Sequence, residues 1–168
     1  MRMFNVGDLV IYSVHGLCEI DDITDKTYGN VTRTYYVMHP LEDPRLTINT
    51  PVDSDKVVML NMMEKEEAEE ILQLFRQPGI SWIEDARNRS KKYNSLVNTG
   101  DRKEISRIVN TLMRKNNEAH QNKKRLYDQD RTLLANIQKI LFKELAMSLN
   151  ISYEDISEQI NRLIKYRA

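Results

Sequence analysis

Apolar residues change their spacing near residue 61, from short runs to the three-and-four spacing of helices. Up to that point they fall in brief runs separated by Gly, Asn, Asp and Pro, a pattern typical of short strands joined by turns. The pattern predicts five strands: Asp8–Ser13, Gly16–Asp22, Thr32–His39, Arg45–Pro51 and Lys56–Leu60. Five short strands in so few residues indicate a small, strongly bent antiparallel barrel.

The rest of the chain has helical periodicity, and its helix starts share one signal. Asn61, Ser81, Asp101 and Ser152 are each followed three residues later by an acid, the pattern of a capping box. The predicted helices cover residues 62–77, 82–98, 102–121, 129–149 and 153–166. The predicted fold class is therefore α+β, with a β domain in residues 1–60 and an all-α domain of about five helices in residues 61–168.

Composition favours a soluble protein without disulfides. Charged residues make up 30% of the 168 residues, and the mean hydropathy is −0.59. No apolar run approaches the roughly 18 residues of a membrane helix, and the first residues lack the features of a signal peptide. Cys18 is the only cysteine, which excludes an intrachain disulfide and a multi-cysteine zinc site. We expect a cytoplasmic protein.

The charges are segregated along the chain. Residues 86–125 contain twelve Lys and Arg against three acids, a local charge of +9 in a chain whose net charge is zero. Residues 61–85 hold two bases and seven acids, and residues 1–60 hold five bases and nine acids. A basic helical region beside an acidic remainder favours a polyanionic partner such as nucleic acid.

The candidates for DNA contact lie on the second predicted helix. Four bases within six residues could meet successive phosphates, although a solvated helix surface is the alternative: Arg87, Arg89, Lys91 and Lys92. Trp82, the only tryptophan, is predicted in the first turn of the same helix. There it could either wedge into the minor groove of DNA or anchor its helix to the core.

Motifs of catalysis and cofactor binding are absent from the sequence. There is no GxxxxGK[ST] or GxGxxG phosphate loop, and no GxSxG, HExxH or CxxC. His15, His39 and His120 are far apart in the chain and lack the spacing of metal ligands. We therefore expect no enzyme, no metal or cofactor site and no small-molecule substrate.

Most of the chain resembles a known family of bacterial transcription regulators. The opening MFNVGDLVIYSVHG, with KTYGNVTRTYYVM and LTINTPVD further on, is similar to the start of CarD-type regulators. The same module occurs in the RNA-polymerase-interacting domain of the transcription-repair coupling factor. The stretches RSKKYNSLVNTGDRKEISRIVNTLMRKN and LLANIQKILFKELAMSL resemble the CarD helical domain.

The resemblance implies a function for each domain. It implies a Tudor-like N-terminal barrel that docks on the β subunit of RNA polymerase. It also implies a helical domain that binds promoter double-stranded DNA near the upstream edge of the transcription bubble, with an exposed tryptophan as a wedge, and so modulates open-complex stability. The strand at Arg45–Pro51 is the expected docking edge, because Pro51 cannot continue a ladder. The polymerase-binding candidates are Lys26, Arg33, Thr47 and Asn49.

The sequence departs from the family pattern at four positions. Ser13 stands where many relatives have Pro, and Lys26 and Asn49 stand where some relatives have polymerase-contacting arginines. An ungapped comparison puts the wedge tryptophan at Ala86, one helical turn after Trp82. Either the wedge has shifted along the helix, or Trp82 is a structural residue.

Three other interpretations are compatible with the sequence. A protein adaptor could bind RNA polymerase without direct DNA contact, in which case acids from residues 61–85 would cover the basic region. An RNA-binding module is the second, although the sequence lacks a GXXG loop and the aromatic pattern of an RRM sheet. A hydrolase is the third, and no motif supports it.

Overall fold

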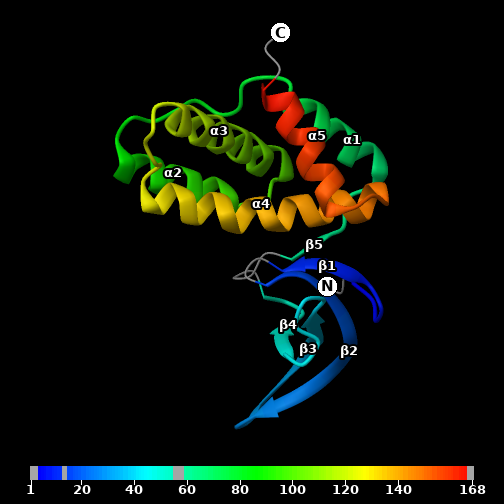
Figure 1. The fold of residues 1–168 in the computed structure, drawn as a ribbon. Helices are drawn as coiled ribbons and strands as arrows, with labels where there is room; N and C mark the ends of the chain where they lie inside the picture. The colour runs from blue at the N-terminus through cyan, green and yellow to red at the C-terminus, as the bar shows by residue number, and fades with distance from the viewer. Residues whose placement is uncertain (1–3, 13–14, 55–58, 166–168) are drawn as a thin grey trace. The chain divides into compact units, whose positions relative to one another are not determined.

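The chain forms two compact units, the sheet unit Met1–Met62 and the helical unit Met63–Ala168. The computed structural model describes residues 4–12, 15–54 and 59–165. Its strands β1 to β5 come first in the chain and its helices α1 to α5 follow (Figure 1). This order confirms the α+β fold class. None of the described helices has the length and apolar character needed to cross a membrane.

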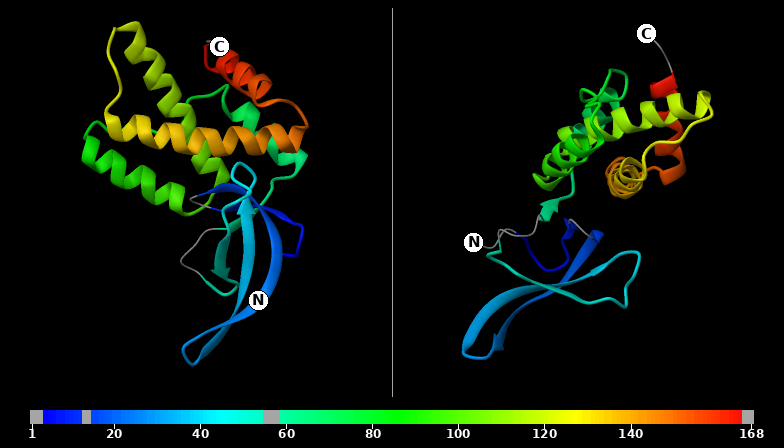
Figure 2. Two further views of the ribbon diagram at one scale, coloured as in Figure 1. Left: turned by 60° about the horizontal axis from the view of Figure 1, so that its bottom comes forward. Right: turned by 90° about the vertical axis from the view of Figure 1, so that its left-hand side faces the viewer.

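The sheet unit is built on one antiparallel sheet. Its strands are β1 (Leu9–Tyr12), β2 (Gly16–Tyr28), β3 (Val31–Pro40), β4 (Ile48–Pro51) and β5 (Met59–Asn61). They pair in the order β4-β3-β2-β1-β5, so among the described strands β4 and β5 are the edges and the sheet does not close into a barrel. The β2–β3 hairpin curves along its length (Figure 2), and a bulge between Ile20 and Asp22 contributes to the bend.

The β2–β3 hairpin is longer than the sequence predicts. The apolar pattern ends at Asp22, whereas β2 continues to Tyr28. Polar pairs between the strands replace apolar alternation in this part: the Thr34 hydroxyl donates to Asp25 at 2.6 Å, and the hydroxyls of Thr27 and Thr32 lie 2.7 Å apart. Ser13 and residues 56–58 of the predicted strands lie outside the described residues.

The helical unit packs five helices around one apolar core. They are α1 (Lys65–Leu74), α2 (Ala86–Asn98), α3 (Arg102–Gln121), α4 (Asp128–Leu149) and α5 (Tyr153–Lys165). Apolar stripes of these helices meet in the core, which includes Phe75, Leu112, Leu145 and Ile160. Two of the predicted caps are confirmed, because Asp101 accepts the amides of Lys103 and Glu104 and Ser152 accepts the amide of Asp155.

The other two predicted caps are wrong, because tertiary contacts hold their segments out of the helix. Before α1, the Met63 amide donates to Glu144 at 2.9 Å and its carbonyl accepts from Ser148, so the helix starts later than residue 62. Before α2, the Ser81 carbonyl accepts from the Tyr93 hydroxyl at 2.8 Å. The cap of α2 is instead Asp85, four residues later than predicted.

The loop between α1 and α2 lies directly on α3. The Ile80 amide donates to the carbonyl of Arg107, and the Ile80 carbonyl accepts from Thr111 at 2.7 Å. Gly79 precedes this contact, and a Cβ at Gly79 would collide with the α3 backbone. The missing side chain therefore lets the loop reach α3, and the loop positions Trp82.

Candidate nucleic-acid interface

Arg89 is a buried structural residue, which corrects its assignment to DNA contact. Its side chain is 1% exposed, and it forms a two-pronged ion pair with the buried Asp130, with Nε 3.0 Å from Oδ1 and Nη2 2.5 Å from Oδ2. Its Nη1 donates to the carbonyl of Ile83 at 2.7 Å. The hydrogen bond to Asp130 raises the pKa of Arg89. A guanidinium enclosed in this way cannot reach a phosphate.

The remaining predicted bases of α2 are at the surface. Arg87, Lys91 and Lys92 are all exposed, and their spacing of four and five places them on adjoining positions of one helix side. Within the described residues none of the three forms an ion pair. Their charges are therefore available to an anionic partner.

Many cations further along the chain are compensated by acids of the same unit. Arg102 binds the buried Glu144 at 2.7 Å and lies 3.9 Å from Glu67, and Lys103 lies 3.6 Å from Glu70. Burial raises the pKa of Glu144, and the ion pair with Arg102 opposes that rise. The acids of residues 61–85 thus cover part of α3, as the adaptor interpretation requires, but they do not cover α2.

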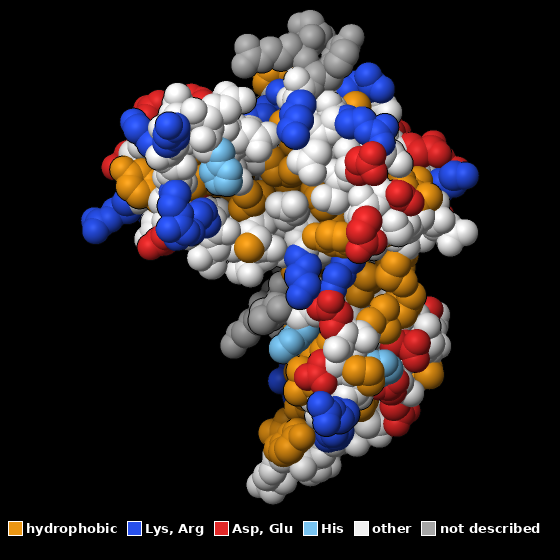
Figure 3. Space-filling view, in the orientation of Figure 1, with side chains coloured by type: hydrophobic (Ala, Val, Ile, Leu, Met, Phe, Trp, Pro, Cys, Tyr) orange, Lys and Arg blue, Asp and Glu red, His pale blue; other side chains and the backbone are white. Residues whose placement is uncertain are grey.

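What remains is a basic surface in two parts. It consists of Arg87, Lys91 and Lys92 on α2, and of Lys123, Lys124 and Arg125 in the connection between α3 and α4. All six side chains are exposed, and none of them forms an ion pair in the part of the chain that the structure describes. Lys and Arg side chains gather at the end of the helical unit where α2 begins and α3 leads into α4 (Figure 3).

Trp82 lies in the loop before α2 and not in a helical turn. Its ring is partly buried against the core of the helical unit. The Arg89 Cζ lies 4.0 Å and the Lys115 Nζ 5.0 Å from the ring centroid, distances of cation–π contacts. These contacts support a structural role for Trp82. The resemblance puts the wedge at Ala86, which is the first residue of α2.

We expect the Trp82→Ala variant to lower the free energy of unfolding by about 2–3 kcal/mol, because packing and two cation–π contacts are lost from a partly buried site. Urea denaturation followed by circular dichroism measures this change. A variant of unchanged stability with altered promoter melting would instead support the wedge role.

An exposed aromatic residue of this region was missed by the sequence analysis. Tyr127 is 66% exposed, and the Cζ of Arg89 lies 5.6 Å from its ring centroid. Its position two residues after the Lys123–Arg125 run was the available signal, because aromatic side chains among bases are typical of nucleic-acid surfaces.

The polymerase-binding candidates of the sheet unit fall into two groups. Lys26 and Arg33 are opposite each other on β2 and β3, and Arg33 binds Asp53 at 3.0 Å, which lowers the pKa of that carboxyl. Asn49 is exposed on β4, and Thr47 is exposed just before it. The strand predicted at Arg45–Pro51 is shorter in the structure, where β4 covers Ile48–Pro51. Its position as an edge of the described sheet is confirmed, since β4 pairs with β3 at one end of the strand order.

The described residues contain one group with the side chains of a metal site. Ligand atoms of Glu19, Asp21 and His39 lie within 4.8 Å of one another. Asp21 and His39 already bind each other at 2.8 Å, and this hydrogen bond raises the pKa of His39. This hydrogen bond accounts for the closeness of Asp21 and His39.

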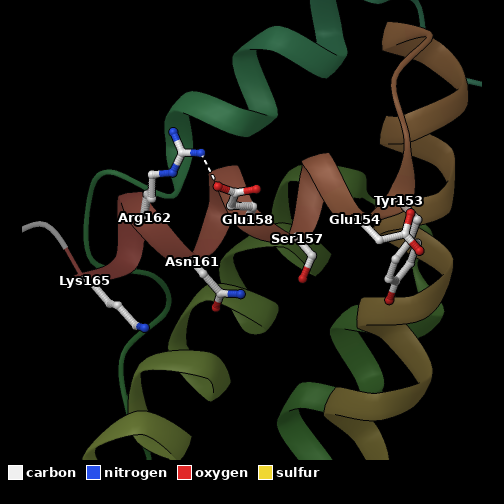
Figure 4. A pocket seen from close by; sticks show the side chains of 7 residues that line it. All are labelled: Tyr153, Glu154, Ser157, Glu158, Asn161, Arg162 and Lys165. Carbon is white, nitrogen blue, oxygen red and sulfur yellow. Dashed lines mark hydrogen bonds and ion pairs between the residues drawn. The ribbon is translucent and has the colours of Figure 1, made fainter.

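A hollow on α5 shows no catalytic arrangement. Its volume is about 580 Å³, and its lining comes from one side of the helix (Figure 4): Tyr153, Glu154, Ser157, Glu158, Asn161, Arg162 and Lys165. Arg162 and Glu158 bind each other at 2.5 Å. No histidine or cysteine is among these lining residues, so the hollow lacks the Ser–His or Cys–His pair of a nucleophilic enzyme.

Comparison with known proteins gives matches to both units. Residues 4–62 match the family model described as "CarD-like/TRCF RID domain", and residues 70–161 match the one described as "CarD, C-terminal domain". A similar protein of Bacillus subtilis (strain 168), named "Putative transcription factor YdeB", is 24% identical over 157 residues, which cover 92% of this chain and 97% of that protein.

Proposed function

Because the chain belongs to the CarD-like family of transcription factors, we propose that it regulates transcription by binding RNA polymerase with its sheet unit and promoter DNA with its helical unit. RNA polymerase is the partner associated with this family. We propose that it docks on the β subunit, contacts promoter DNA directly and alters the stability of the open complex. A protein with these partners acts in the cytoplasm, where polymerase and chromosome meet.

The basic surface is the observation that supports the DNA contact. Six exposed cations without an ion pair among the described residues gather at one end of the helical unit, whereas Arg102 and Lys103 on α3 are paired with acids. Such a surface binds the phosphate backbone with little dependence on base sequence. Because Arg89 is buried, α2 supplies three phosphate contacts, Arg87, Lys91 and Lys92.

The open edge of the sheet supports the polymerase contact. The strand β4 offers main-chain groups to which a strand of the polymerase β subunit could pair. Pro51 at the end of β4 would limit the length of that pairing, and Thr47 and Asn49 stand at the same edge to select the partner. Lys26 and Arg33 on the neighbouring hairpin would add charge.

Docking on polymerase and contact with DNA would together allow weak DNA binding to change the stability of the open complex. Docking on polymerase would hold the basic surface at an effective DNA concentration of roughly millimolar. Tighter binding to the open complex than to the closed complex by about 1.4 kcal/mol would shift that equilibrium tenfold.

The Arg87→Glu, Lys91→Glu, Lys92→Glu triple variant tests the DNA contact. Each lost phosphate contact should reduce the slope of log K against log salt by about 0.9, so we expect the slope for duplex DNA to become shallower by about 2.7. Fluorescence anisotropy across a salt series measures the slope. The open-complex lifetime should lose its dependence on the protein, while co-purification with core polymerase should persist.

The matched control reverses two exposed charges elsewhere. The Arg162→Glu, Lys165→Glu variant alters α5, which lies away from the start of α2 (Figure 1), and should leave the slope nearly unchanged. If the triple variant keeps the normal slope and lifetime, the adaptor interpretation replaces the DNA contact. Loss of both DNA and polymerase binding in a folded triple variant would contradict the division of roles between the units.

A further inference from the structure

Tyr127 combines high exposure with a fixed position. It is the most exposed large hydrophobic side chain in the described part of the chain, at 66%. It stands at the N-cap of α4, where its carbonyl accepts the amide of Arg131 at 3.0 Å. Its backbone is therefore fixed at the start of the 22-residue helix α4, although its side chain is exposed to solvent.

The buried ion pair of Arg89 and Asp130 lies behind this ring. The Arg89 Cζ is 4.0 Å from the Trp82 centroid and 5.6 Å from the Tyr127 centroid, so one guanidinium contacts both aromatic rings. Arg89 is fixed by Asp130, which belongs to the first turn of the same helix that carries Tyr127. An exposed ring with a rigid cation behind it loses little conformational entropy when a flat partner covers it.

The surroundings of Tyr127 define the chemistry of that partner. Lys123, Lys124 and Arg125 precede it in the chain, and all three are exposed. The nearest acid in sequence, Asp128, is paired with Arg131. An aromatic face beside unpaired cations fits a ligand that has flat rings and phosphates, which is a nucleic acid.

From this arrangement we propose that Tyr127 stacks on an unpaired base of DNA, an inference that rests on the proposed DNA contact of the basic surface. In an intact duplex both faces of an internal base are covered by its neighbours, so no face is open to the ring. A melted or mismatched segment exposes such faces, and an aromatic side chain can then replace the lost stacking. Tyr127 would thus distinguish melted from intact DNA, which the phosphate contacts cannot do.

Binding to paired and unpaired DNA tests the inference. The full chain is titrated with two oligonucleotide duplexes of equal length, one fully paired and one with a central mismatched bubble that carries 2-aminopurine. We expect wild-type protein to prefer the bubble by roughly tenfold and to quench the 2-aminopurine fluorescence. Tyr127→Ala should lose both the preference and the quenching, and Tyr127→Phe should keep both, because the ring face remains.

A matched control and distinct outcomes make the test decisive. Tyr28→Ala removes a tyrosine of similar exposure, 61%, from the sheet unit and should change neither readout. A bubble preference that persists in Tyr127→Ala, or a wild type without preference, would overturn the stacking role and leave the phosphate contacts standing. If Tyr127→Ala reduces co-purification with polymerase but leaves DNA binding unchanged, the stacking role would also be overturned, and Tyr127 would instead contact a protein partner. Absence of any salt-dependent binding to duplex DNA would refute the proposed function itself.

Discussion

The Arg89→Ala variant is expected to lower the free energy of unfolding by about 3–5 kcal/mol, the largest effect among the basic residues of α2. The substitution leaves Asp130 buried at 3% exposure without its partner, and it also removes the donor to the Ile83 carbonyl. Loss of the guanidinium further takes one cation–π contact from Trp82. Urea denaturation monitored by far-ultraviolet circular dichroism measures the change.

Two further substitutions separate the effect of the buried position of Arg89 on stability from the effect of its charge. Arg87→Ala removes the same charge from an exposed position on the same helix, and its stability should stay within about 0.5 kcal/mol of the wild type. Arg89→Lys keeps the charge but cannot reproduce the two-pronged contact with Asp130, so it should recover little of the loss. Equal stability of the Arg89→Ala and Arg87→Ala proteins would show that the buried pair contributes nothing.

The different outcomes for Arg87 and Arg89 show what sequence could predict about the site. Both are bases on one helix, and the sequence predicts the helix and its charge. Their environments differ because Asp130, 41 residues further along the chain, lies against Arg89 alone. Sequence spacing within a helix cannot reveal a partner on another helix, so the burial of Arg89 was not predictable from the local pattern.

Some helix starts are set by local capping residues, and others are set by contacts with distant parts of the chain. The caps at Asp101 and Ser152 depend on amides two and three residues away, and both predictions are confirmed. The predicted cap at Ser81 depends equally on local sequence, but Tyr93 and α3 hold that segment in a loop. Local signals were sufficient only where no distant residue competed for the same backbone groups.

The charge pattern along the sequence located the basic region but not the ion pairs within it. The count for residues 86–125 correctly identified a basic region, but it could not show which cations are paired. Pairing of Arg102 with Glu144 and of Lys103 with Glu70 requires that α1, α3 and α4 pack together. Folding thus reduces a diffuse excess of charge to the two exposed groups of the basic surface.

The Gly79→Ala variant is expected to destabilise the helical unit by about 3 kcal/mol or more, because the added methyl group has no space. An ideal Cβ at Gly79 would lie 2.9 Å from the amide nitrogen of Thr111 and still closer to the Arg107 carbonyl and the Thr111 hydroxyl. Two of these three atoms are α3 backbone, which cannot move aside as a flexible side chain would. The loop would have to lift from α3, with loss of both Ile80 hydrogen bonds to that helix.

Fluorescence of Trp82 reports this transition, since the only tryptophan packs within the helical unit on the same loop. Gly29→Ala is the control: its φ of 63° costs about 1 kcal/mol in the sheet unit, no atom lies within 4 Å of the added carbon, and the Trp82 transition should not shift. If Gly79→Ala unfolds at the wild-type urea concentration, the loop does not depend on close approach to α3. Packing of the Trp82 ring on Arg89 would then be what holds the loop in place. In that case Trp82→Ala would lower the free energy of unfolding more than Gly79→Ala does.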